Sequence, residues 1–173
     1  MQFLNKLGGC NHTNGHNECT SMTAEYSLIL RSMKQDITTI KDCRLIQFDA
    51  TKQNGYDICS LRDCSELPYT PKRMYYLYEV PAGSRRGGHS HKECLECLVA
   101  ASGSFEVTVD DGSATKKFTL NRPDQGLLIT TGIWRTLKNF SSGSVCLVFA
   151  SLPYDEDDYI RQYSAFLKSK NKL

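Results

Sequence analysis

Two histidines and a glutamate near the middle of the chain have the residue types that proton transfer or metal binding requires. His89 and His91 are two positions apart, and Glu96 follows five residues later. Side chains at positions i and i+2 of a β-strand point to the same side, so on a strand both imidazoles would face one cavity. Imidazoles exchange protons near neutral pH, and two histidines with one carboxylate can also bind iron. These three residues alone leave both chemistries open.

Short apolar or alternating segments, separated by turn residues, must position these side chains. From Cys43 onward such segments recur at a spacing of roughly ten residues, which is typical of a β-sandwich or a barrel. Asp111-Gly112 between two of them predicts a hairpin. The segments that predict strands are Arg44–Phe48, Lys72–Val80, Leu95–Ala101, Ser104–Asp110, Thr115–Leu120, Gly126–Thr130, Ile133–Phe140 and Ser144–Ser151. The pattern therefore predicts an all-β domain.

The carboxyl end of the chain has a helical pattern instead. Asp155 is a suitable N-cap, and the three acidic residues after it favour the first turn of a helix. Tyr159, Tyr163 and Phe166 recur at i, i+4 and i+7, which gives this helix one apolar stripe. We expect a C-terminal α-helix that packs on the outside of the β-domain.

The amino end has neither pattern. Residues 1–40 contain many Gly and Asn turn formers and no lasting periodicity. We therefore expect a flexible N-terminal extension over residues 1–40, followed by one domain over residues 41–173.

The composition excludes several classes of protein. The chain has 173 residues, of which 40% are hydrophobic and 23% charged, as in globular domains. Its formal net charge of +2 gives no basic surface for nucleic acid. The longest apolar run, Val145–Ala150, is too short to span a membrane, and residues 1–10 contain no apolar signal segment. We expect a cytoplasmic protein with reduced cysteines that binds neither nucleic acid nor membranes.

The histidine segment also matches a known signature. Gly83, His89, His91, Glu96 and Gly103 fit the pattern G-x5-H-x-H-x4-E-x6-G at every fixed position. This segment resembles the first motif of the cupin family, and the resemblance implies a jelly-roll barrel. In the metal-binding cupins the two histidines and the glutamate are ligands, and a second motif supplies another histidine.

The second cupin motif is mostly absent here. The corresponding stretch keeps Gly126, but Leu137 stands at the position of the expected histidine ligand. We therefore expect no metal and no other cofactor, with the two imidazoles transferring protons directly. Two alternatives stay open: a metal-dependent cupin oxygenase and a non-catalytic sugar-binding cupin.

Several longer segments resemble a narrower family, the WxcM-like sugar nucleotide ketoisomerases, over about residues 42–168. The shared motifs are R-G-x-H at Arg86–His89, I-W-R at Ile133–Arg135 and Y-D-E-x-D-Y-I-R at Tyr154–Arg161. The family's D-x-R-G is replaced by Gln53-Asn54-Gly55-Tyr56, so its arginine is absent. The resemblance implies an isomerase that converts a dTDP-linked 4-keto-6-deoxyglucose into its 3-keto isomer during deoxy-amino-sugar biosynthesis. It also implies a homodimer with exchanged N-terminal strands.

The implied reaction assigns roles to individual residues. Moving the ketone from C4 to C3 removes a proton from C3, forms an enediolate and adds a proton at C4. The candidate catalytic residues for these proton transfers are His89 and His91. The cations that could balance the charges of the enediolate and the diphosphate are Arg86, Lys92 and Arg135. The aromatic side chains that could contact thymine and sugar are Tyr76, Tyr78 and Trp134. Glu96 is expected to orient an imidazole.

Overall fold

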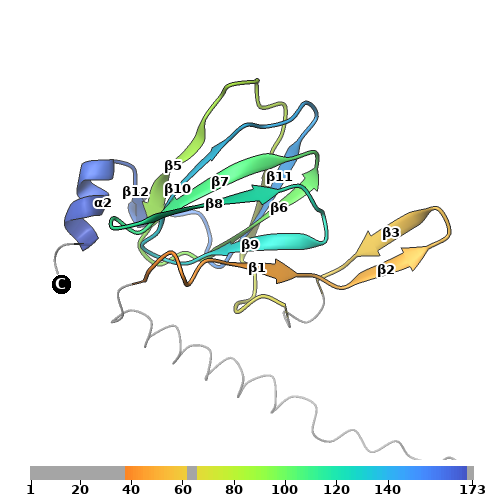
Figure 1. Ribbon diagram of the computed structural model, residues 1–173. Helices are drawn as coiled ribbons and strands as arrows, with labels where there is room; N and C mark the ends of the chain where they lie inside the picture. The colour runs from red at the N-terminus through yellow and green to blue at the C-terminus, as the bar shows by residue number, and fades with distance from the viewer. Residues whose placement is uncertain (1–37, 62–65, 171–173) are drawn as a thin grey trace, which may run out of the picture. The chain divides into compact units, whose positions relative to one another are not determined.

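The computed structural model describes residues 38–61 and 66–170, and two antiparallel sheets form the centre of this part of the chain (Figure 1). The first sheet contains, in order, β1 (Arg44–Gln47), β9 (Gln125–Ile129), β6 (Glu96–Ser102), β11 (Val145–Ala150) and β4 (Arg73–Leu77). The second contains β12 (Tyr159–Ile160), β5 (Arg86–His91), β10 (Trp134–Lys138), β7 (Phe105–Asp110) and β8 (Thr115–Leu120). The chain passes repeatedly from one sheet to the other, as in a jelly roll. The predicted all-β cupin fold is confirmed.

Alternating side chains produce the core between the two sheets. On β7 every second residue is buried, and β11 shows the same alternation. Most of their inward residues, among them Phe105, Val107 and Val148, belong to one apolar cluster that both sheets share. Burying a side chain of this size contributes about 1.5–3 kcal/mol. The alternation therefore fixes which face of each strand is turned inward, and with it the side on which the polar site residues lie.

The eight predicted strands correspond to β1, β4 and β6 through β11, with ends that differ by a few residues. The sequence pattern gave no indication of the hairpin formed by β2 (Ala50–Gln53) and β3 (Tyr56–Cys59). All eight residues of these two strands are exposed, so they show no apolar alternation. The hairpin, turned by Asn54-Gly55, extends away from the two sheets (Figure 1).

The predicted start of the C-terminal helix is wrong. Asp155 caps only a 3₁₀ turn, η1 (Glu156–Asp158), by accepting a hydrogen bond from the Asp157 backbone amide at 3.0 Å. The chain then extends as β12, whose two residues pair with Ser90 and His91 of β5. The α-helix, α2, spans Tyr163–Lys170. Pairing with β5 outweighs the local helical pattern, because tertiary contacts routinely override helix propensity. Tyr159 consequently leaves the apolar stripe of the helix.

The N-terminal expectations lie almost entirely outside the described residues. The chain divides into two units, and the described residues belong to the second, Ile37–Leu173. The expected flexibility of residues 1–40 stays a prediction. Within residues 38–61 and 66–170, no helix has the length and apolar character needed to cross a bilayer.

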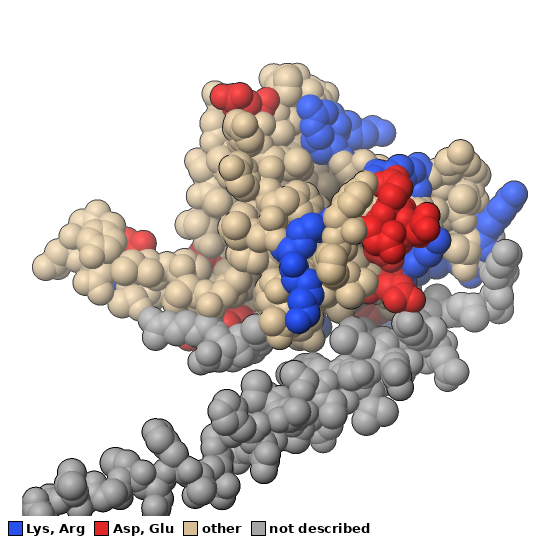
Figure 2. All heavy atoms as spheres, turned by 180° about the vertical axis from the view of Figure 1, so that it is seen from behind, with Lys and Arg blue, Asp and Glu red and all other residues tan. Residues whose placement is uncertain are grey.

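The charged side chains form small mixed groups. On the face shown in Figure 2, the Lys and Arg side chains are separated by neutral surface, and the largest acidic group has basic side chains beside it. This face therefore carries no continuous basic stripe of the kind that nucleic-acid binding uses.

Candidate active site

A β-bulge in β5 orients the side chains of His89 and His91. Arg135 on β10 pairs with His89 while the next residue, Thr136, pairs with Gly87, so Gly88 is the extra residue. Gly87 and Gly88 both have a positive φ, of 75° and 72°. A Cβ atom on Gly87 would lie 2.8 Å from the carbonyl oxygen of Arg135. The R-G-G-H sequence is thus what allows the bulge, and bulges commonly redirect side chains beside active sites.

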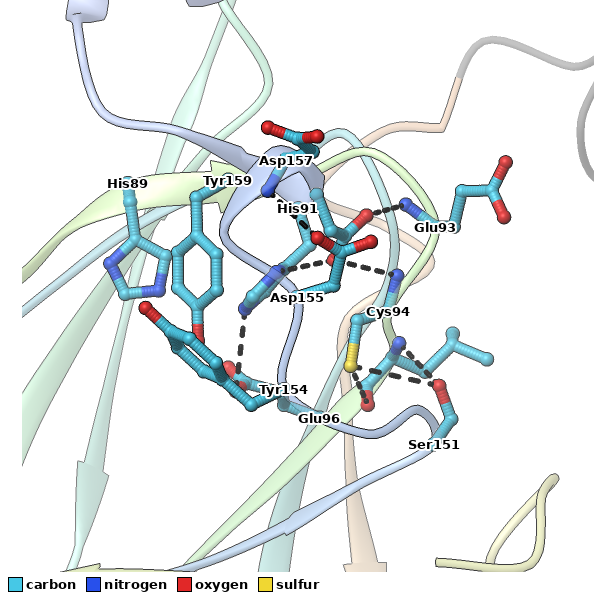
Figure 3. Close-up of polar contacts among 12 residues, drawn as sticks. His89, His91, Glu93, Cys94, Glu96, Ser151, Tyr154, Asp155, Asp157 and Tyr159 are labelled. Atoms are coloured by element: carbon cyan, nitrogen blue, oxygen red, sulfur yellow. Dashed lines mark hydrogen bonds and ion pairs between the residues drawn. The ribbon is translucent and has the colours of Figure 1, made fainter. Parts of the chain in front are cut away.

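His91 lies between two carboxylates (Figure 3). Its Nδ1 is 2.7 Å from Asp158 Oδ2, and its Nε2 is 3.4 Å from Glu96 Oε1. The side chain is only 1% exposed. Asp158 comes from η1, the acidic segment that the sequence assigned to a helix start. Asp158 was therefore not among the predicted site residues, and its signal in the sequence was its place in the Tyr154–Arg161 motif.

Glu96 is the anionic centre of a buried network. Its Oε2 accepts a hydrogen bond from Arg135 Nη2 at 2.5 Å, and its Oε1 accepts one from the Tyr75 hydroxyl at 2.8 Å. Glu96 and Arg135 are each 2% exposed. Burial alone would raise the pKa of Glu96, but Arg135 and His91 outweigh burial and hold this pKa well below its usual range. Glu96 is therefore ionised, and Arg135 is its main counter-charge.

His89 faces the same interior but has free ring nitrogens. Neither Nδ1 nor Nε2 of His89 has a hydrogen-bond partner within residues 38–61 and 66–170, although both atoms are buried. Burial, followed by the positive charge of Arg135, lowers the pKa of His89 to about 3. The imidazole is thus neutral at neutral pH and carries a lone pair that can accept a proton. Leaving such a nitrogen buried and unpaired costs free energy, which a bound substrate could recover.

The aromatic ring of Tyr159 packs against both imidazoles. The Tyr159 ring lies against both, with centroids 4.9 Å from His89 and 4.3 Å from His91 (Figure 3). The Arg73 guanidinium lies over the Tyr75 ring and reaches the Tyr159 hydroxyl at 3.4 Å. Tyr159 and Arg73 were not predicted as site residues, because the sequence places Tyr159 on the expected helix stripe and Arg73 within a predicted strand.

The structure brings together some of the predicted site residues. His89, His91, Glu96 and Arg135 form one group. Arg86 and Lys92 are exposed at the two ends of β5. The aromatic residues expected at the substrate lie elsewhere: Tyr76 on β4 and Tyr78 just after it are exposed, and the Trp134 ring packs against Tyr163 and Phe166 of α2.

Donor atoms within the group lie close enough for a metal ion by distance alone. Those of His89, His91 and Glu96 lie within 4.8 Å of one another, as do those of His91, Cys94 and Asp158. However, Glu96 already binds the Arg135 guanidinium, and His91 Nδ1 already binds Asp158. Leu137 is buried where the second cupin motif has its histidine. Glu96 and His91 Nδ1 are thus committed to protein partners, so neither group of three offers a complete set of free ligands for a resident metal.

Comparison with known proteins identifies the family. Residues 41–171 match the family model described as FdtA, WxcM-like, C-terminal. This chain belongs to the FdtA family. A TDP-4-oxo-6-deoxy-alpha-D-glucose-3,4-oxoisomerase of Aneurinibacillus thermoaerophilus is 35% identical to it over 130 residues, which cover 75% of this chain and 94% of the relative. The predicted family is confirmed.

Solved structures agree with this placement in the FdtA family. A 3,4-ketoisomerase from Helicobacter canadensis is 40% identical, with a TM-score of 0.73 over 76% of this chain and 98% of the other. A mutant of the 3,4-ketoisomerase QdtA from Thermoanaerobacterium thermosaccharolyticum, in complex with TDP-4-keto-6-deoxyglucose, is 31% identical, with a TM-score of 0.75 over 78% and 97% of the two chains. The FdtA-family chain therefore covers nearly the whole length of each relative.

Proposed function

We propose that this FdtA-family protein is a cytoplasmic sugar-nucleotide 3,4-ketoisomerase that converts dTDP-4-keto-6-deoxyglucose into its 3-keto isomer. The observation that supports this most is the neutral His89 imidazole, whose two nitrogens are unpartnered among the described residues, beside His91. Relatives that cover the same domain are named as 3,4-ketoisomerases or oxoisomerases. The expected product would serve the biosynthesis of deoxy amino sugars.

In the proposed mechanism, His89 accepts the proton from C3 of the sugar. The negative charge of the enediolate then stabilises the imidazolium, so the proton can be returned at C4 while the hydroxyl proton passes from O3 to O4. His91, held between Asp158 and Glu96, is the second candidate for proton transfer. Arg86 and Lys92 are free of ion pairs within the described residues and would bind the diphosphate. We assign Arg135 a different role from the expected one, because its guanidinium is committed to Glu96.

The proposed activity can be tested directly. The protein is incubated with dTDP-4-keto-6-deoxyglucose, and the 3-keto product is trapped as an amino sugar by a 3-aminotransferase. Conversion that depends on the protein supports the proposal. Binding of the keto sugar without turnover, and without exchange of its protons with solvent, would instead support the sugar-binding cupin.

Metal removal separates the isomerase from the oxygenase alternative. Dialysis against a strong chelator should leave the rate of isomerisation unchanged, because Arg135 supplies the positive charge beside Glu96. The rate is measured before and after dialysis, with total metal determined in both samples. Loss of activity that returns with one divalent metal would contradict the metal-free mechanism.

We also propose that two copies of the chain form a dimer, as the family resemblance implies. β4 lies at the edge of the first sheet and exposes Met74 and Tyr76, and Tyr78 just after the strand is exposed as well. A groove of about 360 Å³ adjoins this edge and is lined mainly by apolar side chains, including Leu67 and Phe149. Exposed apolar edges of this kind are normally covered. A second copy of the chain, including its exposed β2–β3 hairpin, is the proposed occupant.

Charge on the β4 edge should disrupt this dimer. Tyr76→Lys combined with Tyr78→Lys places two cations in the proposed interface, and sedimentation equilibrium should then report a monomer. Thr115→Lys, at an exposed position on the edge strand β8 of the other sheet, serves as the matched control and should leave the dimer intact. A wild-type protein that sediments as a monomer, or a double variant that still dimerises, would contradict this interface.

A further inference from the structure

Asp158 connects η1 to the end of β5 through several polar contacts. Its Oδ2 accepts a hydrogen bond from His91 Nδ1 at 2.7 Å and one from the Cys94 backbone amide at 3.3 Å. Its Oδ1 accepts one from the Glu93 amide at 2.6 Å, and its carbonyl oxygen accepts one from the Lys92 amide at 2.9 Å. The side chain is largely buried. One acidic residue thus holds both the imidazole and the loop that follows it.

The chemistry of this contact fixes the proton on the ring. An ionised carboxylate only accepts hydrogen bonds, so a ring nitrogen that is hydrogen-bonded to it must carry the hydrogen. Nδ1 of His91 makes that hydrogen bond, to Asp158, and is therefore the donor. Nε2 points inward and has no hydrogen-bond partner among the described residues, with Glu96 Oε1 3.4 Å away. The His89 ring stands nearly perpendicular to the His91 ring, with the centroids 5.1 Å apart. The Asp158 contact sets both the rotation of the His91 ring and its tautomer.

We propose that Asp158 is a positioning residue for His91, which holds hydrogen on Nδ1 and leaves Nε2 as the nitrogen that gains and loses the proton. The proposal rests on the proposed function, because it gives His91 a part in the proton transfer. It goes further than the proposed function in two ways. It assigns the proton transfer of His91 to Nε2, and it assigns the choice of tautomer to Asp158, which lies outside the cupin motif.

Two neighbouring aspartates allow the positioning role to be separated from a structural one. Asp158 and Asp155 both accept backbone hydrogen bonds that stabilise η1 and its surroundings. Only Asp158 reaches an imidazole. Asp158→Asn keeps an oxygen for the backbone amides, but it removes the charge and adds an NH₂ group that can donate to Nδ1. Asp155→Asn changes an aspartate of the same turn that does not touch the histidines.

The first measurement is the tautomer of His91. In protein labelled with ¹⁵N-histidine, the chain has four histidines, and His91→Asn identifies the signals of His91 by their loss. Wild type and Asp155→Asn should both show hydrogen on Nδ1. Asp158→Asn should shift His91 toward the form with hydrogen on Nε2 only. Hydrogen on Nε2 alone in the wild type would overturn the proposal, even if no Asp158 variant folds.

The second measurement is steady-state turnover of dTDP-4-keto-6-deoxyglucose. Asp158→Asn should lower kcat by about 10²-fold, the lower end of the range for a misplaced acid–base group, and should leave KM unchanged. Asp155→Asn should change neither constant. An Asp158→Asn protein with wild-type kcat, or with a raised KM as its only defect, would overturn the positioning role. Absence of any isomerisation by the wild type would instead refute the proposed function, and the tautomer measurement would still decide the role of Asp158.

Discussion

His89→Asn should lower the rate of isomerisation by about 10²- to 10⁴-fold, the usual cost of removing a positioned general base. The side chain occupies a space in which its ring nitrogens have no hydrogen-bond partner among the described residues, so asparagine should be accommodated without unfolding. Turnover is measured with the aminotransferase trap, and folding by thermal unfolding. In deuterated water the wild type should place deuterium at C4 of the 3-keto product, and incorporation should fall together with turnover in the variant.

The matched control is His12→Asn, which changes a histidine outside the residues that match the family. This variant should keep wild-type turnover. A folded His89→Asn protein with the wild-type rate would exclude His89 from the chemistry.

The stability of the protein in acid gives a second test of the environment of His89. The native state, with a His89 pKa of about 3, binds fewer protons than the unfolded state, whose histidine pKa is about 6.5. This group therefore destabilises the fold as the pH falls below about 6.5, and His89→Asn should lose less stability than the wild type between pH 6 and 4.

Glu96→Gln should destabilise the fold by about 3–5 kcal/mol, because it leaves the Arg135 guanidinium buried without its counter-charge. Urea unfolding of the variant and the wild type measures this difference. The double variant Glu96→Met/Arg135→Met removes both charges and should recover most of the lost stability. The surface pair of Glu106 and Lys117 provides the control: its charges are 3.3 Å apart but partly exposed, so Glu106→Gln should cost less than about 1 kcal/mol.

Equal loss of unfolding free energy in Glu96→Gln and Glu106→Gln would show that the buried ion pair stabilises the fold no more than the surface pair does.

The contribution of Glu96 to the free energy of unfolding depends on pH. The pKa of Glu96 is lower in the folded state than in the unfolded state, so its contribution to stability is present above about pH 4.3 and is lost as the pH falls. The Glu96→Gln variant should lack this part of the acid sensitivity.

Most of the sheet structure could be predicted because it depends on local alternation. Strands such as β7 and β11 bury one face and expose the other, and this leaves a period of two in the sequence. The β2–β3 hairpin buries neither face, so no period marked it. The segment after Asp155 has a real helical pattern, yet it pairs with β5 instead. That pairing depends on a strand far earlier in the chain, and no local window contains it.

The site residues were likewise predictable where their position depends on local spacing. The spacing of His89, His91 and Glu96 on two consecutive strands was enough to bring them together. Arg135 was expected to face the substrate, but its burial against Glu96 depends on the register between β5 and β10, which includes the bulge at Gly88. Asp158 and Tyr159 join the site through the β12–β5 pairing. Their roles follow from topology and not from the residues that surround them in the sequence.

The order of the strands along the chain also has a consequence for synthesis on the ribosome. β1 cannot pair until β9 has been translated, because Leu45 lies opposite Leu127. β4 likewise cannot pair until β11 has been translated. β12 is later still: residues 159 and 160 pair with Ser90 and His91, which are translated near the middle of the chain. A nascent polypeptide interrupted after β11 would contain every strand of the first sheet but would lack Asp158 and Tyr159. Residues 158–160 must therefore be translated before the histidines acquire their surroundings, and products that end after β11 should fold without becoming active.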